Sequence, residues 1–291
     1  MDIPRWASDS FCWAVAHTGI PWLLRETAQR GGAIILCYHD PSPEVLRDHL
    51  AFLSRRYSLV SLREVVRWLY GETEGLPPKA LVVTLDDGWA GNLLLEPVFA
   101  ESGVVPTVFV CTQIAGTRRG FWFKAVPEGP EKDRLKTLPD AERLARLAGV
   151  GYDELQESDA EPETVGAGEL RAMLAWADVQ SHTRFHPILP ACDDERARRE
   201  IEGSMAELRE ILGSSEVYAL AYPDGNGTPR EAGMAREAGY LCALTIRPGR
   251  VRKGADPFAL PRVVVADDAD RDEIAVRVSG IHGLVRRVVG S

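Results

Sequence analysis

Two adjacent carboxylates follow an apolar run in the first third of the chain. Residues 81–85 are Leu-Val-Val-Thr-Leu, and Asp86, Asp87 and Gly88 come directly after them. Asp-Asp-Gly alone is typical of a turn. Two carboxylates at one site repel each other, however, so a site that keeps both needs a cation or a proton. The pair therefore predicts either a plain turn or a centre where one carboxylate binds metal and the other moves protons.

A pair of histidines, His182 and His186, follows a second apolar run at residues 177–181. Imidazoles at this spacing can face one cation, although such a pair also occurs by chance in loops. Pro187 disfavours helix at His186, so we expect a tight turn. With Asp87 the histidines would provide three ligands and leave a position for water, as in catalytic sites. Such ligands suit one divalent ion, zinc first, with cobalt, nickel, manganese or iron as alternatives.

Two further polar clusters lie where apolar runs end. Residues 217–222 lead into Pro223-Asp224-Gly225, which forms turns readily without any function. His39 follows the run at residues 33–38, where a lone histidine is more often structural than catalytic. All four clusters nevertheless fall at the carboxyl ends of predicted strands, which is where barrel active sites are built.

Seven short apolar runs are the candidate strands that must position these side chains. They lie at residues 33–38, 81–85, 106–111, 177–181, 217–222, 240–246 and 259–265. Helical patterns between them cover residues 43–57, 61–70, 90–102, 193–212 and 229–238. Alternating strands and helices predict a parallel sheet with right-handed crossovers. We therefore expect an α/β fold, a distorted or incomplete (β/α)7 barrel.

One stretch interrupts this alternation. Residues 117–164 contain no convincing strand but have a helical stripe of leucines at positions 135, 138, 144 and 147. The sequence thus predicts a helical insertion at about 117–165 in a barrel domain of residues 33–291, after an N-terminal helical segment at 1–32. Residues 149–164 are acidic and contain no Lys or Arg, which predicts a solvated surface. Residues 272–289 are expected to form an amphipathic helix that covers the barrel.

Composition and charge predict which partners the protein lacks and the kind of compartment in which it lies. The 291 residues include 43 Asp and Glu against 34 Lys and Arg, a net charge of −9. Nucleic-acid binding needs clustered cations, so we expect no nucleic-acid partner. The five cysteines contain no Cys-x-x-Cys pair and are expected to be buried thiols in a reducing compartment.

The first thirty residues lack a secretory signal, which predicts a cytoplasmic protein. Apolar residues between 11 and 24 predict a helix that either packs on its own domain or contacts the inner face of a membrane. The sequence makes no prediction about the oligomeric state.

Several of these segments together resemble a known family. Residues 84–88, Thr-Leu-Asp-Asp-Gly, and 182–187, His-Thr-Arg-Phe-His-Pro, resemble two motifs of the polysaccharide deacetylases, the NodB-homology group or carbohydrate esterase family 4. Tyr38-His39, Tyr222-Pro223 and Leu260-Pro261-Arg262 resemble the permuted subgroup that includes poly-N-acetylglucosamine deacetylases. The resemblance covers residues 34–265 without the insertion. It implies a metal-dependent hydrolase that removes an N-acetyl group from an amino sugar of a glycan or glycan precursor.

The resemblance also implies roles for single residues. Asp87, His182 and His186 would bind the metal, and Asp86 would be the catalytic base. The histidine near the start of the chain, here His39, supplies the catalytic acid in the subgroup.

Two positions depart from the third motif of many relatives. Ala221 stands where those relatives have arginine, and Asp224 stands where they have tyrosine. We expect Arg262 to orient Asp86 in place of the missing arginine. The backbone N–H of Asp224 is still expected to stabilise the oxyanion.

The substrate is less sharply defined by the sequence. Trp89, Trp122, Phe185 and Tyr222 are candidates for contact with a sugar, although such aromatics are as often packed in loops. The missing export signal favours a lipid-linked or nucleotide-linked precursor. The alternatives are a deformylase of a lipid-linked amino sugar and a catalytically silent glycan-binding barrel. A phosphoesterase would need more carboxylates or a second cation, and basic residues for phosphate.

Overall fold

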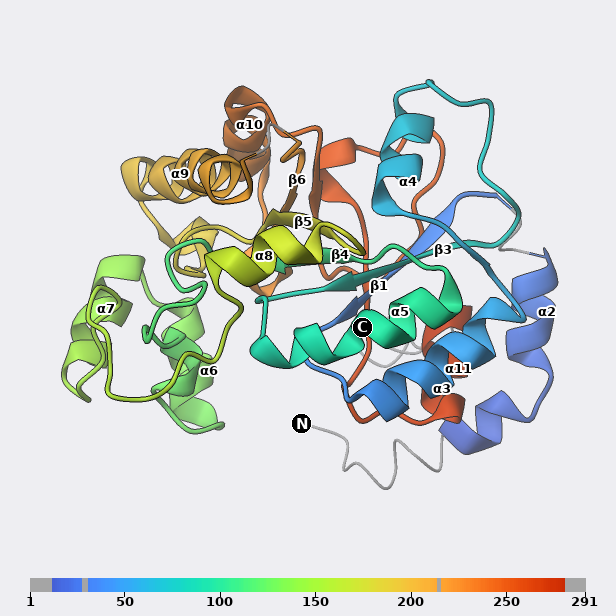
Figure 1. Cartoon of the computed structure of the whole chain (residues 1–291), viewed down its shortest axis with the longest axis horizontal. Coiled ribbons are helices and arrows are strands. Elements are labelled where there is room, and N and C mark those ends of the chain that lie inside the picture. The colour runs from blue at the N-terminus through green and yellow to red at the C-terminus, as the bar shows by residue number, and fades with distance from the viewer. Residues whose placement is uncertain (1–11, 28–30, 214–215, 281–291) are drawn as a thin grey trace.

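The computed structural model describes residues 12–27, 31–213 and 216–280 (Figure 1). Its centre is a parallel sheet with the order β7-β6-β5-β4-β3-β1-β8. The strands are β1 (Ala33–Tyr38), β3 (Ala80–Leu85), β4 (Thr107–Val110), β5 (Asp178–Ser181), β6 (Ala219–Ala221), β7 (Cys242–Leu244) and β8 (Val263–Val264). A further short strand, β2 (Ser58–Leu59), pairs with β3 in parallel. All seven predicted strands are present, most of them shorter than predicted.

The sheet curls toward closure. Leu260 forms a parallel bridge with Leu244 of β7, and Val263 and Val264 just after it pair with β1. One segment therefore connects the two ends of the sheet. The predicted distorted (β/α)7 barrel is confirmed.

Alternate residues of the strands build two separate cores. Leu36, Val83 and Val110 belong to the core between the sheet and its outer helices. Ile35 and Val82 point the other way and pack with the side chains of one helix, α4 (Leu62–Leu69). Because both faces of a parallel sheet are covered, every residue of β1 and β3 is buried. That burial explains the continuous apolar runs in the sequence.

In the described part of the chain, six helices lie on the outside of the sheet, and several of them begin or end at ordinary capping signals. They are α3 (Pro43–Ser54), α5 (Glu96–Ser102), α8 (Ala167–Met173), α9 (Asp194–Leu212), α10 (Pro229–Ala238) and α11 (Arg271–Ser279). Asp193 caps α9, and Gly239 ends α10 with a left-handed φ of 96°. The predicted helix over residues 90–102 is instead a 3-10 turn (Ala90–Leu95) followed by α5. The sequence analysis did not predict α8.

The insertion is helical, as expected. Helices α6 (Pro130–Thr137) and α7 (Asp140–Ala148) lie at the opposite end of the molecule from α3 and α11 (Figure 1). Leu135 and Leu147 pack around Trp122 in a small core of their own. The acidic stretch that follows is mostly exposed, but the side chain of Glu154 is only 13% exposed because it pairs with Arg196. The prediction of a purely solvated surface is therefore wrong at Glu154.

The chain ends are only partly described. Helix α2 (Ile20–Thr27) contacts α11 but has no buried residue, and Trp22 and Leu23 are 59% and 52% exposed. Membrane contact through this region stays a prediction. Within the described ranges, no helix has both the length and the apolar character that a membrane span requires. The end of the predicted helix over 272–289 lies outside the described residues. All five cysteines are buried, as predicted.

Candidate active site

The turn after β3 carries two buried carboxylates. Asp86 and Asp87 are 3% and 4% exposed. Asp87 and Gly88 both have left-handed backbones, with φ of 72° and 70°. Gly88 is needed here, because a Cβ at this position would lie 2.7 Å from Cγ1 of Val110. The sharp turn keeps both carboxylates at the carboxyl edge of the sheet.

The turn after β5 carries the histidines. It is not helical, as Pro187 predicts, and Thr183 and His186 have φ of 69° and 58°. Left-handed conformations are unfavourable for such residues and persist where surrounding contacts impose them. One such contact is the backbone N–H of His186, which donates to Oγ1 of Thr183 at 3.2 Å. The turn brings both imidazoles to one side.

Asp87, His182 and His186 converge on one point. Oδ1 of Asp87 lies 3.5 Å from Nε2 of His182 and 3.6 Å from Nε2 of His186. Each of the three residues offers one ligand atom, and these atoms lie within 4.8 Å of one another. The structure therefore brings Asp87 together with two histidines that lie about a hundred positions later in the sequence.

The chemistry of this donor set fits a divalent cation. Oδ1 of Asp87 is buried without a hydrogen-bond partner, although it lies between two imidazoles. Nδ1 of His182 donates to the carbonyl of Ala221 at 2.8 Å, which fixes the ring so that Nε2 faces Asp87. Burial lowers the pKa of His186 to about 4, so this imidazole is neutral at neutral pH. An unpartnered carboxylate oxygen and two imidazole nitrogens are a donor set that suits a divalent cation.

Asp86 is paired with a fully buried arginine. Nη1 and Nη2 of Arg262 donate to Oδ1 and Oδ2 of Asp86, both at 2.7 Å. Burial alone would raise the pKa of Asp86, but the guanidinium of Arg262 outweighs it and holds that pKa well below its usual range. The Cys37 thiol donates to Oδ2 at 3.4 Å. Asp86 is thus ionised and oriented, and Arg262 stands where the sequence analysis expected it.

His39 faces the same carboxylate from the end of β1. A ring nitrogen of His39, Sγ of Cys37 and a carboxylate oxygen of Asp86 lie within 4.8 Å of one another. This group is no second metal site, because Arg262 engages both oxygens of Asp86 and burial raises the pKa of the Cys37 thiol. His39 is half-buried, and only its backbone is anchored, to Asp267 and Asn92. Its imidazole therefore borders the site.

Asp224 lies in the turn after β6 and is close enough for its charge to act on His186. Its backbone is left-handed, with φ of 51°. Oδ1 accepts from Nζ of Lys136 at 3.1 Å, and Oδ2 is buried without a partner. Lys136 belongs to α6, so the insertion reaches the site. The sequence analysis did not foresee this contact, because nothing local links two residues 88 positions apart.

Three of the four aromatic residues proposed for sugar contact are buried. Trp122, Phe185 and Tyr222 are 2%, 4% and 1% exposed. Trp122 donates its indole N–H to the carbonyl of His186, and the Tyr222 hydroxyl donates to the carbonyl of Phe258. Stacking on a sugar requires an open ring face. None of these three rings has an open face in this structure, and their contact with a sugar stays a prediction.

The remaining aromatic candidate, Trp89, is half-buried. Its indole N–H donates to Oδ2 of Asp87 at 3.1 Å, so it orients a predicted metal ligand. Phe123 of the insertion is also half-buried and lies edge-on to His186, with ring centroids 5.1 Å apart. These two rings are the half-buried aromatics that border the site.

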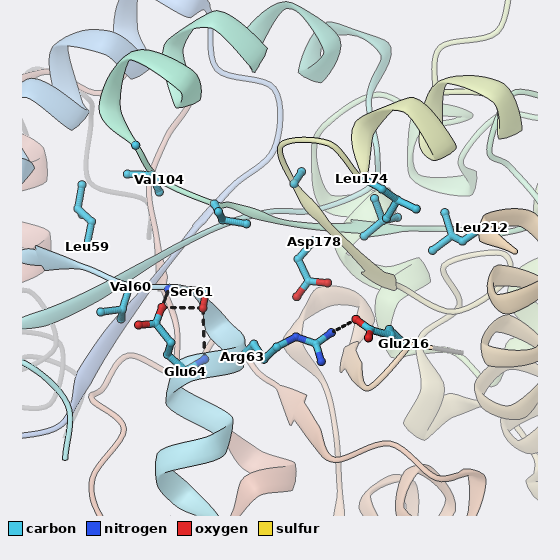
Figure 2. A pocket seen from close by; sticks show the side chains of 14 residues that line it. Leu59, Val60, Ser61, Arg63, Glu64, Val104, Leu174, Asp178, Leu212 and Glu216 are labelled. Atoms are coloured by element: carbon cyan, nitrogen blue, oxygen red, sulfur yellow. Dashed lines mark hydrogen bonds and ion pairs between the residues drawn. The ribbon is translucent and has the colours of Figure 1, made fainter. Parts of the chain in front are cut away.

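A separate pocket of about 450 Å³ lies at the amino-terminal ends of β4 and β5 (Figure 2). Its wall includes Val104, Arg63, Glu216 and Asp178, the first residue of β5. Arg63 pairs with Glu216 at 3.0 Å, and Asp178 accepts hydrogen bonds from Tyr218 and Gln180. Because Asp86, Asp87 and the histidines follow the carboxyl ends of their strands, this pocket is at the opposite edge of the sheet.

Comparisons with known proteins agree with this geometry. The family model described as polysaccharide deacetylase matches residues 73–243, which include both carboxylates and both histidines. No curated protein matches the sequence. Solved structures of similar fold include the Streptococcus pyogenes deacetylase PplD in complex with acetate, with a TM-score of 0.63 and 16% identity over 86% of this chain and 99% of that one.

Two other solved structures are similar. IcaB from Ammonifex degensii has a TM-score of 0.63 and 22% identity over 86% of this chain and 98% of that one. The BpsB deacetylase domain from Bordetella bronchiseptica has a TM-score of 0.58 and 17% identity over 80% and 95%. At these identities the likeness shows a shared fold.

Proposed function

Since this chain belongs to the polysaccharide deacetylase family, we propose that it is a metal-dependent hydrolase that removes the N-acetyl group from an amino sugar of a glycan or glycan precursor. Family membership supports the deacetylation of a glycan. The metal dependence rests on one observation, the buried Asp87 oxygen that lacks a hydrogen-bond partner between Nε2 of His182 and Nε2 of His186. A divalent cation, zinc first, suits these ligands.

The reaction breaks the amide C–N bond of the N-acetyl group and joins the oxygen of water to the carbonyl carbon. When bound, a divalent cation polarises a carbonyl group and lowers the pKa of water toward neutrality. Asp86 takes the proton from the attacking water, because Arg262 keeps its carboxylate ionised and fixes its direction. The products are acetate and a free amine.

Two further groups complete the proposed mechanism. His39 donates a proton to the departing nitrogen, which is a poor leaving group while unprotonated. The backbone N–H of Asp224 stabilises the negative oxygen that develops on the carbonyl group, as in an oxyanion hole. Support for this comes from the place of Asp224 beside His186 and from its left-handed turn, which is stabilised from outside by Lys136.

Metal analysis combined with amine release tests the proposed function. We expect about one divalent ion per purified chain and equal amounts of acetate and amine from N-acetylglucosamine oligomers or from lipid-linked or nucleotide-linked N-acetylhexosamines. Formylated analogues in the same panel test the deformylase alternative. If the protein binds the sugars but releases neither acid nor amine with zinc, cobalt, nickel, manganese or iron added, the silent glycan-binding alternative is correct.

We predict that His39→Ala lowers kcat by roughly 10²- to 10⁴-fold, the usual contribution of a general acid. KM and metal content should stay near their wild-type values, because the His39 side chain does not belong to the Asp87, His182 and His186 set. Steady-state kinetics and the Tm of the variant check this. His17→Ala, at an exposed histidine, is the control. A fall in Tm with unchanged kcat would show that His39 only packs at the strand end.

A further inference from the structure

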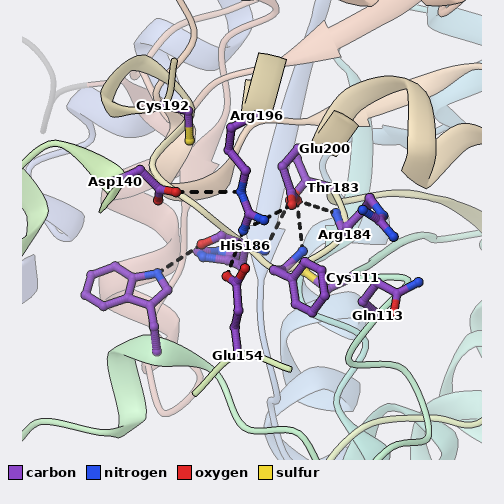
Figure 3. Close-up of polar contacts among 12 residues, drawn as sticks. Cys111, Gln113, Asp140, Glu154, Thr183, Arg184, His186, Cys192, Arg196 and Glu200 are labelled. Carbon is purple, nitrogen blue, oxygen red and sulfur yellow. Dashed lines mark hydrogen bonds and ion pairs between the residues drawn. The ribbon is translucent and has the colours of Figure 1, made fainter. Parts of the chain in front are cut away.

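Glu200 of α9 lies beside the turn that carries the two histidines (Figure 3). It is 0% exposed. Its Oε2 accepts hydrogen bonds from the backbone N–H of Arg184 at 2.8 Å and of Phe185 at 2.9 Å. Both donors stand between His182 and His186 along the chain. Because one carboxylate oxygen accepts from both of these N–H groups, Glu200 restrains the backbone of the turn.

The turn needs restraint from outside. Thr183 and His186 both have left-handed φ values, and neither is glycine. Within the turn, the N–H of Thr183 donates to Oγ of Ser181 at 3.3 Å and the N–H of His186 donates to Oγ1 of Thr183 at 3.2 Å. Left-handed residues persist when neighbouring structure determines them. Glu200 provides two of the contacts that do so.

Arg196 connects Glu200 to the insertion. Its Nη2 lies 2.7 Å from Oε2 of Glu154 and 3.3 Å from Oε1 of Glu200, and its Nε lies 3.6 Å from Oδ2 of Asp140. The guanidinium also lies over the ring of Phe185, 5.4 Å from the centroid. The side chains of Arg196, Glu154 and Asp140 are 15%, 13% and 9% exposed. Charges that are this shielded from water interact more strongly than exposed ion pairs.

The insertion reaches the same turn by a second route. Trp122 donates its indole N–H to the carbonyl of His186 at 2.9 Å. Arg143 of α7 lies over the Trp122 ring and forms an ion pair with Asp140. The turn is thus contacted directly by Glu200 of α9 and by Trp122 of the insertion, and Glu154 of the insertion reaches it through Arg196.

We infer that Glu200 is a positioning residue for the metal-binding turn, and that Arg196 makes its effect depend on the insertion through Glu154. Glu200 does not belong to the Asp87, His182 and His186 set, so it acts through the backbone between the two imidazoles. This inference rests on the proposed metal site. If the inference is correct, the insertion contributes to the geometry of the metal site and does not only pack against the barrel.

The test is the affinity of the full chain for Zn²⁺ alone, measured at pH 7 by competition with a chromophoric chelator. We expect Glu200→Ala to bind Zn²⁺ about 10- to 100-fold more weakly, as is usual when a group that orients metal ligands is removed. Glu200→Gln keeps an oxygen that can accept both N–H groups and should recover much of the affinity. Glu154→Ala should lose less affinity than Glu200→Ala.

Each variant has a matched control. Glu202→Ala removes an exposed glutamate two positions along α9, and Glu157→Ala removes an exposed glutamate three positions from Glu154 that pairs with Arg118. Both controls should bind Zn²⁺ like the wild type. Circular dichroism establishes which variants are folded. If Glu200→Ala does not fold, the Zn²⁺ affinity of Glu154→Ala tests the inference. The Glu154 side chain lies at the edge of the ion pairs that Arg196 makes, so its removal should leave the fold intact.

Wild-type Zn²⁺ affinity in folded Glu200→Ala overturns the positioning role. Wild-type affinity in Glu154→Ala overturns the dependence on the insertion. Failure of the proposed function looks different, because Asp87→Ala would then bind Zn²⁺ as the wild type does.

Discussion

Asp87→Ala is expected to remove both the stoichiometric metal ion and the release of amine. The variant leaves two imidazoles and no carboxylate, which is too few ligands for a stable catalytic site. A bound ligand stabilises the folded state by about 2.7 kcal/mol at a hundred times its Kd. For a chain of this size we expect a rise in Tm of roughly 4 to 5 °C when zinc is added to the wild type, and none in the variant.

Atomic emission analysis, amine release and thermal unfolding with and without zinc measure these effects. Asp48→Ala, an exposed aspartate on α3, is the control and should behave like the wild type. A variant that keeps its metal ion would contradict the assignment of Asp87 as a ligand.

Asp86→Asn is expected to keep the metal ion and to lose turnover by roughly 10²- to 10⁴-fold, the usual contribution of a general base. Asparagine has nearly the same shape but cannot accept a proton at neutral pH. It also leaves the charge of Arg262 buried without its partner, which typically costs about 3 to 5 kcal/mol of stability. Metal content, kcat and Tm are therefore measured together.

A double variant separates catalysis from stability. Asp86→Asn with Arg262→Met removes the buried charge that the single variant leaves unpaired, so Tm should recover in part while turnover stays lost. Asp178→Asn is the matched control, a carboxylate at the other end of the sheet that also accepts two hydrogen bonds. Recovery of turnover in the double variant would remove Asp86 from the role of base.

The amino-acid pattern by itself determined the strands and the edge of the sheet where the site lies. Apolar runs appear wherever a strand is covered on both faces, and parallel strands present their carboxyl ends at one edge. Asp87, His182 and His186 could therefore be grouped from sequence, and the family resemblance is confirmed. The short strand β2 escaped prediction because two residues show no periodicity.

Only the tertiary structure decided what surrounds each site residue. Burial depends on what packs over a side chain, so the sequence could not separate the buried ring of Trp122 from the half-buried ring of Phe123. The bidentate contact of Arg262 with Asp86 spans 176 positions and exists because β8 returns beside β1. Glu200 carries no motif, and its role comes from the crossing of α9 beside the histidine turn. Local sequence patterns determine the helices and strands. Contacts between helices and strands that are distant in the sequence depend on how the whole chain folds around its hydrophobic cores.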